Sequence, residues 1–242
     1  MRARLRLLTA VATTGIALGG LSACGMLRDH FDDDTTVTEK ITSVRLDSGS
    51  GAITLHGKEG ATKVDLHRYV EYDGDRPSQT HHVENGVLVL SGCGDDCSVA
   101  YTVDLPAGIP VTGQTSSGAV ELAHTGPVSV STSSGAIELD DIKGAVDVRA
   151  SSGAITGKRL NGGPIKAKTS SGAIDLGASS PEDVKAQASS GAVTVAVPAD
   201  RYRVTAKSQS GGMEIAIDDD PTGPHHLDVS TSSGAIHVKT TT

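Results

Sequence analysis

A five-residue phrase, Ser-Ser-Gly-Ala-Ile, recurs along most of the chain and is seen in full at residues 133–137. Eight glycines anchor its copies, and from Gly118 onward they are separated by 17, 18, 19, 19, 20 and 23 residues. A repeat of this length that lengthens gradually is typical of stacked coils joined by loops of adjustable length. The anchoring glycines are Gly51, Gly118, Gly135, Gly153, Gly172, Gly191, Gly211 and Gly234.

The apolar pattern changes parity at each of these glycines. Upstream, apolar or small residues stand seven, five and three positions before the glycine, as in Val128, Val130 and Thr132. Downstream they stand two and four positions after it, as in Ile137 and Leu139. Because side chains alternate between the faces of a strand, both sets can face one core only if the chain turns between them. We therefore expect a corner at each repeat, where glycine gives backbone freedom and the serine hydroxyls bond nearby backbone groups.

The composition favours a slender core. The chain has no tryptophan, four tyrosines and one phenylalanine, but 29 glycines. Such small residues fill a wide globular core poorly, whereas a narrow solenoid needs only small aliphatic side chains pointing inward. We predict an all-β, single-domain parallel β-solenoid (β-helix) with coils of roughly 18–20 residues. The alternative is an antiparallel β-meander or sandwich, in which each Ser-Ser-Gly is a hairpin turn.

The first residues have the order of an export signal. Three arginines precede an apolar run over residues 7–20, and Leu-Ser-Ala-Cys follows at residues 21–24. These four residues resemble the lipobox of bacterial lipoproteins, in which the cysteine thiol takes a diacylglycerol. We predict that residues 1–23 are a lipoprotein signal peptide and that Cys24 carries the lipid. The protein would then be exported and anchored to the outer face of the cytoplasmic membrane. The alternatives are an ordinary secretory signal and a cysteine that stands at this position by chance.

Two further stretches depart from the repeat. Residues 24–38 include Asp32-Asp33-Asp34 and lack a periodic apolar pattern, so we predict a flexible tether there and the solenoid over residues 39–242. Between Gly51 and Gly118 the motif is lost, although the length allows about three coils. A strand is expected at residues 64–66, a tight turn at Asn85-Gly86 and a strand at residues 101–105.

Cys93 and Cys97 are the other two cysteines, in Cys-Gly-Asp-Asp-Cys. In an exported chain this spacing favours a local disulfide. The alternative is a redox or zinc pair, but there is no second cysteine pair to complete a zinc set, and the spacing differs from that of thioredoxin-like motifs.

The charge pattern bears on possible partners. The formal charge is −8, and loss of the three arginines of the signal peptide makes it −11, so we expect no nucleic-acid partner. Acidic residues recur three positions after several of the corner glycines. Cations recur four and six positions before them, and on successive coils they would form a stripe that binds an anionic envelope polymer; a solvated face is the alternative. These cations are Arg149, Lys166, Lys168, Lys185 and Lys207.

We find no catalytic constellation in the sequence. One serine per coil is a structural ladder, and no Gly-x-Ser-x-Gly elbow is present. We assign the adjacent histidines His81-His82 and His225-His226 to loops, without a metal, and Asp218-Asp219-Asp220 to an acidic loop. We therefore expect a protein that is not an enzyme and that has no cofactor or metal.

The repeats, the phrase Tyr-Thr-Val-Asp-Leu-Pro-Ala-Gly at residues 101–108 and the lipobox together resemble the bacterial putative-adhesin family of β-strand-repeat proteins, a domain of unknown function. The resemblance covers residues 39–242 and implies a β-helix on an exported protein. Many relatives have aspartate where this chain has alanine after the glycine, so no acidic or metal-binding property is carried over. The expected role is that of an adhesin-like or scaffolding surface at the cell envelope, with the membrane, an envelope polymer or a protein as partner. The alternatives are an enzyme acting on envelope polysaccharide and an accessory sensor in envelope-stress signalling.

Overall fold

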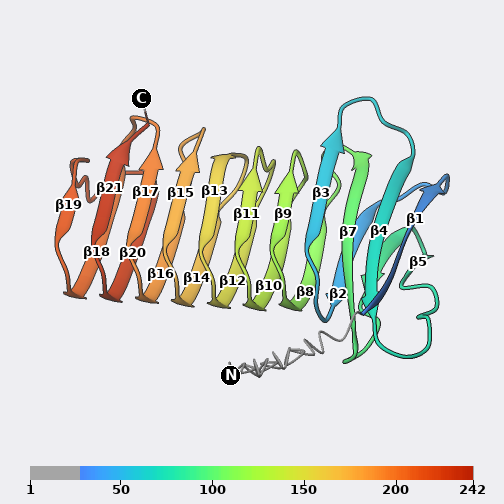
Figure 1. Ribbon diagram of the computed structural model, residues 1–242. Helices are drawn as coiled ribbons and strands as arrows, with labels where there is room; N and C mark the ends of the chain where they lie inside the picture. Colours follow the sequence, from blue (N-terminus) through green and yellow to red (C-terminus); the bar gives the residue numbers. More distant parts are fainter. Residues whose placement is uncertain (1–27, 242) are drawn as a thin grey trace, which may run out of the picture.

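The computed structural model describes residues 28–241, whose 21 strands form two facing sheets, A and B (Figure 1). In spatial order, sheet A contains β1 (Asp29–Val37), β4 (Val64–Tyr72), β7 (Cys97–Pro106), β3 (Ile53–Lys58), β9 (Val120–Ala123), β11 (Ile137–Asp140), β13 (Ile155–Leu160), β15 (Ile174–Ala178), β17 (Val193–Val197), β21 (Ile236–Thr240) and β19 (Met213–Ile215). Sheet B contains β18 (Tyr202–Ser210), β20 (His225–Ser233), β16 (Val184–Ser190), β14 (Ile165–Ser171), β12 (Val146–Ser152), β10 (Val128–Ser134), β8 (Val111–Ser117), β2 (Ser43–Ser48), β6 (Val87–Ser91) and β5 (His81–Glu84).

Each coil consists of one strand of sheet B, a corner and one strand of sheet A. Neighbouring coils pair in parallel with like residues in register, so that Val128 lies opposite Val146 and Ile137 opposite Ile155. The predicted parallel β-solenoid is thus confirmed. Among the described strands, antiparallel pairing occurs only at one end, where β1 pairs with β4, β4 with β7 and β5 with β6.

The corners form where the parity changes, as the sequence predicts. All eight motif glycines have positive φ, for example 146° at Gly172. A Cβ on Gly172 would overlap the carbonyl group of Gly153 in the adjacent coil, so only glycine fits this close approach. The Thr169 hydroxyl, three positions before the glycine, donates to that carbonyl oxygen at 3.1 Å. The expectation that the serine pair holds the corner was wrong for most coils, because the pairs are exposed. In two coils a buried threonine bonds the carbonyl oxygen of the neighbouring corner glycine instead, Thr169 that of Gly153 and Thr231 that of Gly191.

The coils do not stack in sequence order at the two ends. The β6–β7 coil follows β2–β3 in sequence but lies nearer the β1 end of the stack. The β2–β3 coil therefore pairs directly with β8 and β9. At the other end the β20–β21 coil is inserted between β16–β17 and β18–β19. The chain therefore skips one coil position after β17 and returns to fill it after β19. This return accounts for the spacing of 23 residues between Gly211 and Gly234.

The sequence had suggested about three coils between Gly51 and Gly118. The region contains one complete coil, β6–β7, the antiparallel strands β4 and β5, and one strand each of the two flanking coils, β3 and β8. The expected turn is present, with positive φ at both Asn85 and Gly86. The expected strands are also present, as β4 and β7.

The predicted tether is wrong for most of its length. Residues Asp29–Val37 form β1, which pairs antiparallel with the whole of β4. The fold therefore begins at Asp29, ten residues before the expected boundary at Glu39. Phe31 belongs to this strand and packs edge-on against Tyr72, with the Arg76 guanidinium 3.9 Å from the centre of its ring.

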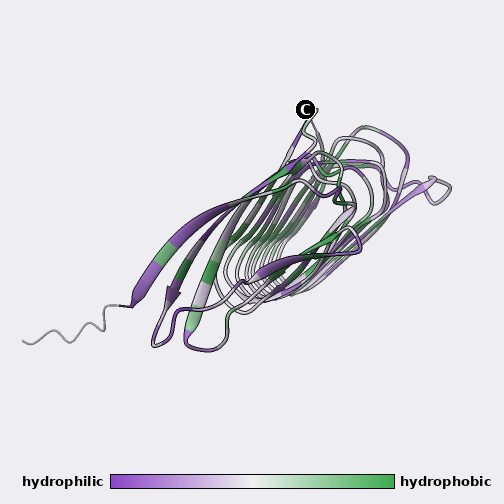
Figure 2. Cartoon of the chain, turned by 90° about the vertical axis from the view of Figure 1, so that its right-hand side faces the viewer, coloured by the Kyte–Doolittle hydropathy of each residue, from purple (hydrophilic) through white to green (hydrophobic). Residues whose placement is uncertain are grey.

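The core is a narrow apolar interior enclosed by the two sheets. Viewed from the β1 end, the coils superpose around it (Figure 2). Nearly all inward positions carry Val, Ile, Leu or Ala with almost no exposure, which agrees with the small-residue composition.

Candidate functional site

A groove crosses sheet B where its strands approach the corners. It encloses ≈ 580 Å³ and reaches from β2 across β8, β10 and β12 to β14. Its lining repeats, because successive coils contribute the residues two and four positions before the corner glycine. The lining side chains with hydroxyl, amide or charged groups at these positions are Asp47, Gln114, Ser116, Ser131, Ser133, Arg149, Ser151, Lys168 and Ser170.

The parallel register sets the spacing of these groups. Gln114 lies opposite Ser131, Ser131 opposite Arg149, and Arg149 opposite Lys168. Adjacent strands are about 4.8 Å apart, so polar groups recur along the groove at that interval. A ligand with an extended, repeating structure can contact them in succession.

Four of the five predicted polymer-binding cations come together beside and within this groove. Arg149 lies opposite Lys168, and Lys166 lies opposite Lys185. All four line a smaller hollow of ≈ 120 Å³. Lys207 does not join them, because the inserted β20 separates β18 from β16 and places Ser230 beside Lys207.

Two of the four cations are already paired. Arg149 Nη2 lies 3.0 Å from Asp147 Oδ2, and Lys185 Nζ lies 2.8 Å from Asp228 Oδ2. Lys166 and Lys168 have no ion pair within residues 28–241. The positive charge available to a ligand in this region therefore comes mainly from these two lysines.

Sheet A carries the opposite sign of charge. The positions three residues after the corner place Glu121 beside Glu138, and both line a hollow of ≈ 190 Å³. The two faces of the solenoid thus differ in charge, as the sequence predicts.

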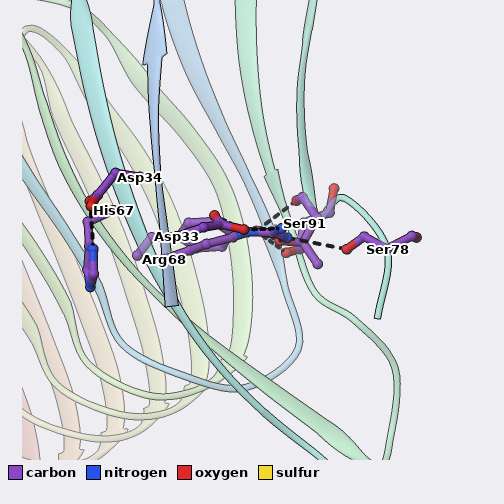
Figure 3. Close-up of polar contacts among 8 residues, drawn as sticks. Asp33, Asp34, His67, Arg68, Ser78 and Ser91 are labelled. Atoms are coloured by element: carbon purple, nitrogen blue, oxygen red, sulfur yellow. Dashed lines mark hydrogen bonds and ion pairs between the residues drawn. The ribbon is translucent and has the colours of Figure 1, made fainter. Parts of the chain in front are cut away.

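A second polar cluster closes the solenoid at the β1 end (Figure 3). Arg68 is 7% exposed and donates hydrogen bonds from Nε and Nη2 to the two carboxylate oxygens of Asp33, each at 2.7 Å. Its Nη1 donates to Thr80 Oγ1 at 3.0 Å. The hydroxyl of Tyr101 donates to the carbonyl oxygen of Ser91 at 2.7 Å.

The ionisation of this cluster follows from its contacts. The hydrogen bonds from Arg68 lower the pKa of Asp33. Burial raises the pKa of Tyr101 to about 12. Burial, followed by repulsion from Arg68, lowers the pKa of His81. At neutral pH the cluster therefore holds one charged pair and neutral neighbours, an arrangement suited to closing the end of the core.

Sequence reasoning missed this cluster, although a signal was present. Val64, Leu66, Arg68 and Val70 alternate along one strand, and the period of two places Arg68 on the core side with the aliphatic residues. A buried guanidinium requires a carboxylate partner. The partner could not be identified, because Asp33 was assigned to the tether.

The other predicted sites have different outcomes. The Cys93–Cys97 disulfide is confirmed, with Cα atoms 5.5 Å apart. The histidine pairs lie on strands β5 and β20, so their assignment to loops was wrong. Cys24 and the signal peptide lie outside the described residues.

Residues 28–241 contain neither a cluster of metal ligands nor a membrane-spanning helix. No group of three or more His, Cys, Asp or Glu side chains there is arranged to hold a metal ion. In the same residues, no helix has the length and apolarity that a membrane crossing requires.

The family of the chain follows from a match over most of its length. The sequence profile of the Toastrack DUF4097 family matches residues 38–242. The chain belongs to the Toastrack DUF4097 family. This assignment agrees with the row of parallel strands in Figure 1 and with the resemblance of the repeats to the putative-adhesin family. It does not assign an activity, since the domain is one of unknown function. No protein with a curated description matches this Toastrack sequence.

Several solved structures are similar to this Toastrack chain at low identity. A putative adhesin from Parabacteroides distasonis has a TM-score of 0.48 and 13% identity, over 88% of this chain and 98% of that one. A putative cell adhesion protein from Clostridium sporogenes has a TM-score of 0.42 and 12% identity, over 88% and 100% of the two chains. A putative lipid binding protein from P. distasonis has a TM-score of 0.44 and 13% identity, over 87% and 97%. TM-scores and identities this low do not indicate a shared function.

Proposed function

We propose that this Toastrack chain is a non-catalytic, lipid-anchored solenoid at the cell envelope that holds an extended anionic polymer along the groove of sheet B. Its role would be adhesin-like or scaffolding. The observation that carries the proposal is the repeating groove, in which serine hydroxyl groups recur on successive coils and lead to Lys166 and Lys168. Positive charge gathered on one face of an otherwise acidic chain favours an anionic ligand.

The polar lining supports retention of a polymer more than its cleavage. Glycoside hydrolysis usually requires two carboxylates flanking the scissile bond, and the groove lining contains one, Asp47. Sugar-cleaving solenoids also lay their substrates on aromatic rings, and no aromatic side chain lines this groove. The abundant serines point to hydrogen bonding with a polymer backbone.

The location rests on two independent features. The lipobox-like residues before Cys24 support export and lipidation. The Cys93–Cys97 disulfide fits an oxidising compartment outside the cytoplasm. β1 begins five residues after Cys24, so the lipid would lie close to the β1 end of the solenoid.

The test is binding of the purified protein to isolated envelope polymers, with inorganic polyphosphate as a defined anionic probe. The double variant Lys166→Gln/Lys168→Gln should bind about tenfold more weakly, and added salt should have a similar effect on the wild type because it screens exposed charges. Lys40→Gln/Lys63→Gln is the matched control, since it removes two exposed lysines that line neither hollow of sheet B. Equal binding by the wild type and both variants, with no dependence on salt, would reject the groove as an anionic-polymer site.

A further inference from the structure

The solenoid is open at the end opposite β1. Met213 and Ile215 occupy the core-facing positions after their corner but are 54% and 37% exposed. Ile236 and Val238, at the same positions one coil further in, are 0% and 1% exposed. The apolar pattern is the same in both coils, so the exposure arises because no further coil of residues 28–241 covers β18 and β19, the last strands of the two sheets (Figure 1).

The backbone is also unpaired along part of this end. The loop after β19 covers the beginning of β18, where the Val204 N–H donates to Asp219 Oδ1 and the Asp220 N–H donates to the Tyr202 carbonyl oxygen, both at 2.8 Å. Backbone groups on one side of a strand recur at every second residue, so Ala206 and Ser208 present theirs to the same open side. An uncovered edge of this kind is a template for pairing with another strand.

The β1 end is built differently. There the antiparallel strands β1 and β4 extend sheet A, and the short hairpin of β5 and β6 ends sheet B. The Arg68–Asp33 pair, joined by two hydrogen bonds, lies at the end of the interior there. Solenoids need polar terminal units to remain soluble, and in the described residues only this end has one.

We propose that a second copy of this chain covers the open end, joined end to end about a two-fold axis. The open end presents two strand edges with an apolar interior between them, and a single peptide strand could pair with only one of the edges. The same end of another copy has the matching cross-section, so the second half of β18, which the loop leaves uncovered, can pair with the same half of β18 in the other copy, and β19 can pair with β19. A two-fold axis makes both pairs antiparallel and buries Met213 and Ile215 against their own copies.

The charges at this end are compatible with self-association. Residues 201–220 carry three cations and four carboxylates, a near balance in a chain with a net charge of −8. No large excess of one charge therefore opposes the approach of a second copy.

The consequence for adhesion rests on the proposed lipid anchor. The anchor would lie at the β1 end, and β18 and β19 form the far end (Figure 1). Pairing through the far ends would join two molecules anchored in facing membranes. Such pairing would give the solenoid an adhesive role through the binding of one copy to another.

The first test measures the mass of the chain from residue 24 onward, carrying Cys24→Ser, by sedimentation over a range of concentrations. This chain contains every described residue. We expect the mass to approach twice that of the monomer, and Ile215→Lys to weaken the dimer at least about tenfold because it buries a charge at the axis. Tyr69→Lys is the matched control, since Tyr69 is also 37% exposed but lies near the closed end. A monomer at all concentrations, or equal weakening by both variants, would overturn the proposal.

A second variant and a second readout separate folding from pairing. Met213→Lys should weaken the dimer as Ile215→Lys does, while the circular-dichroism spectra of both variants stay like that of the wild type, because only the association is lost. Lipidated protein on vesicles should cluster the vesicles, and Ile215→Lys should abolish the clustering without releasing the protein. Protein that fails to bind vesicles at all would contradict the anchor and leave the solution dimer intact. A solution dimer that binds vesicles but does not cluster them would overturn the bridging role.

Discussion

Asp33 on β1 and Arg68 on β4 lie directly opposite each other and are joined by two hydrogen bonds of 2.7 Å. The pair fixes the first strand of the chain onto the end of the solenoid. It also satisfies a guanidinium that the alternation of β4 directs toward the core. The attachment of β1 therefore depends on a contact between residues 35 positions apart.

Replacing Asp33 by Ala should destabilise the protein. The substitution leaves Arg68 nearly buried without a carboxylate, and we expect a loss of about 2–3 kcal/mol in the free energy of unfolding. This lies at or below the bottom of the range for fully buried pairs, because the Asp33 side chain is 35% exposed. Denaturant unfolding measures the loss, and hydrogen exchange should show β1 opening before the other strands. Asp34→Ala is the control: its partner His67 lies at the surface, so a loss as large as that of Asp33→Ala would contradict this account.

The free energy of unfolding should fall as the pH drops below 6.5, the ordinary pKa of histidine, because His81 is buried. Its pKa is lowered from the ordinary value of 6.5 by burial and by Arg68, so the folded state holds fewer protons than the unfolded state. The contribution of His81 is then fully present above 6.5 and is lost as the pH falls toward the folded pKa. Asp33 shifts in the same direction from 3.8, so its contribution is lost at lower pH and is separable. Unfolding free energies from about pH 7 to about pH 5 should decline more steeply for the wild type than for His81→Gln; parallel curves would show that His81 does not contribute.

A side chain at a corner glycine should be costly. Gly172→Ala introduces a Cβ that overlaps the Gly153 carbonyl, at a residue with φ of 146°, and we expect a loss of about 1–3 kcal/mol or more. Gly177→Ala is the control within the same coil, because its Cβ would meet only the Gly157 oxygen at an ordinary 3.7 Å. Thermal unfolding compares the two variants. If Gly177→Ala destabilised the protein as much as Gly172→Ala, the corner geometry would not be the cause.

Cys24→Ala should remove the lipid anchor. The thiol is the expected acceptor of the diacylglycerol, so the variant should lack the lipid and accumulate either uncleaved or released from the membrane. Membrane fractionation and mass analysis of the amino terminus provide the measurement. A variant that is still diacylated and processed like the wild type would rule out Cys24 as the modified residue.

The candidate groove was only partly predictable. The stripe of Arg149, Lys166, Lys168 and Lys185 follows from counting back from each glycine, because the coils of this region do stack in sequence order. Lys207 fits the same count but lies apart, since the later strand β20 enters between its coil and the others. The hydroxyl lining could also have been placed from the repeat. The interpretation of the serine pairs as corner bonds instead left the first serine of each pair out of the groove lining.

The sequence by itself determined the coil: where each strand begins, which residues face inward, and where glycine must turn the chain. These features depend on local backbone sterics and on the period of two, which act within a single repeat. Only the tertiary structure decided the order of the coils and the strand status of residues 29–37. Every coil presents nearly equivalent edges, so no local pattern specifies which coil pairs with which. The charged β1 has no apolar period of its own, and its conformation depends on pairing with β4 and on the distant Arg68.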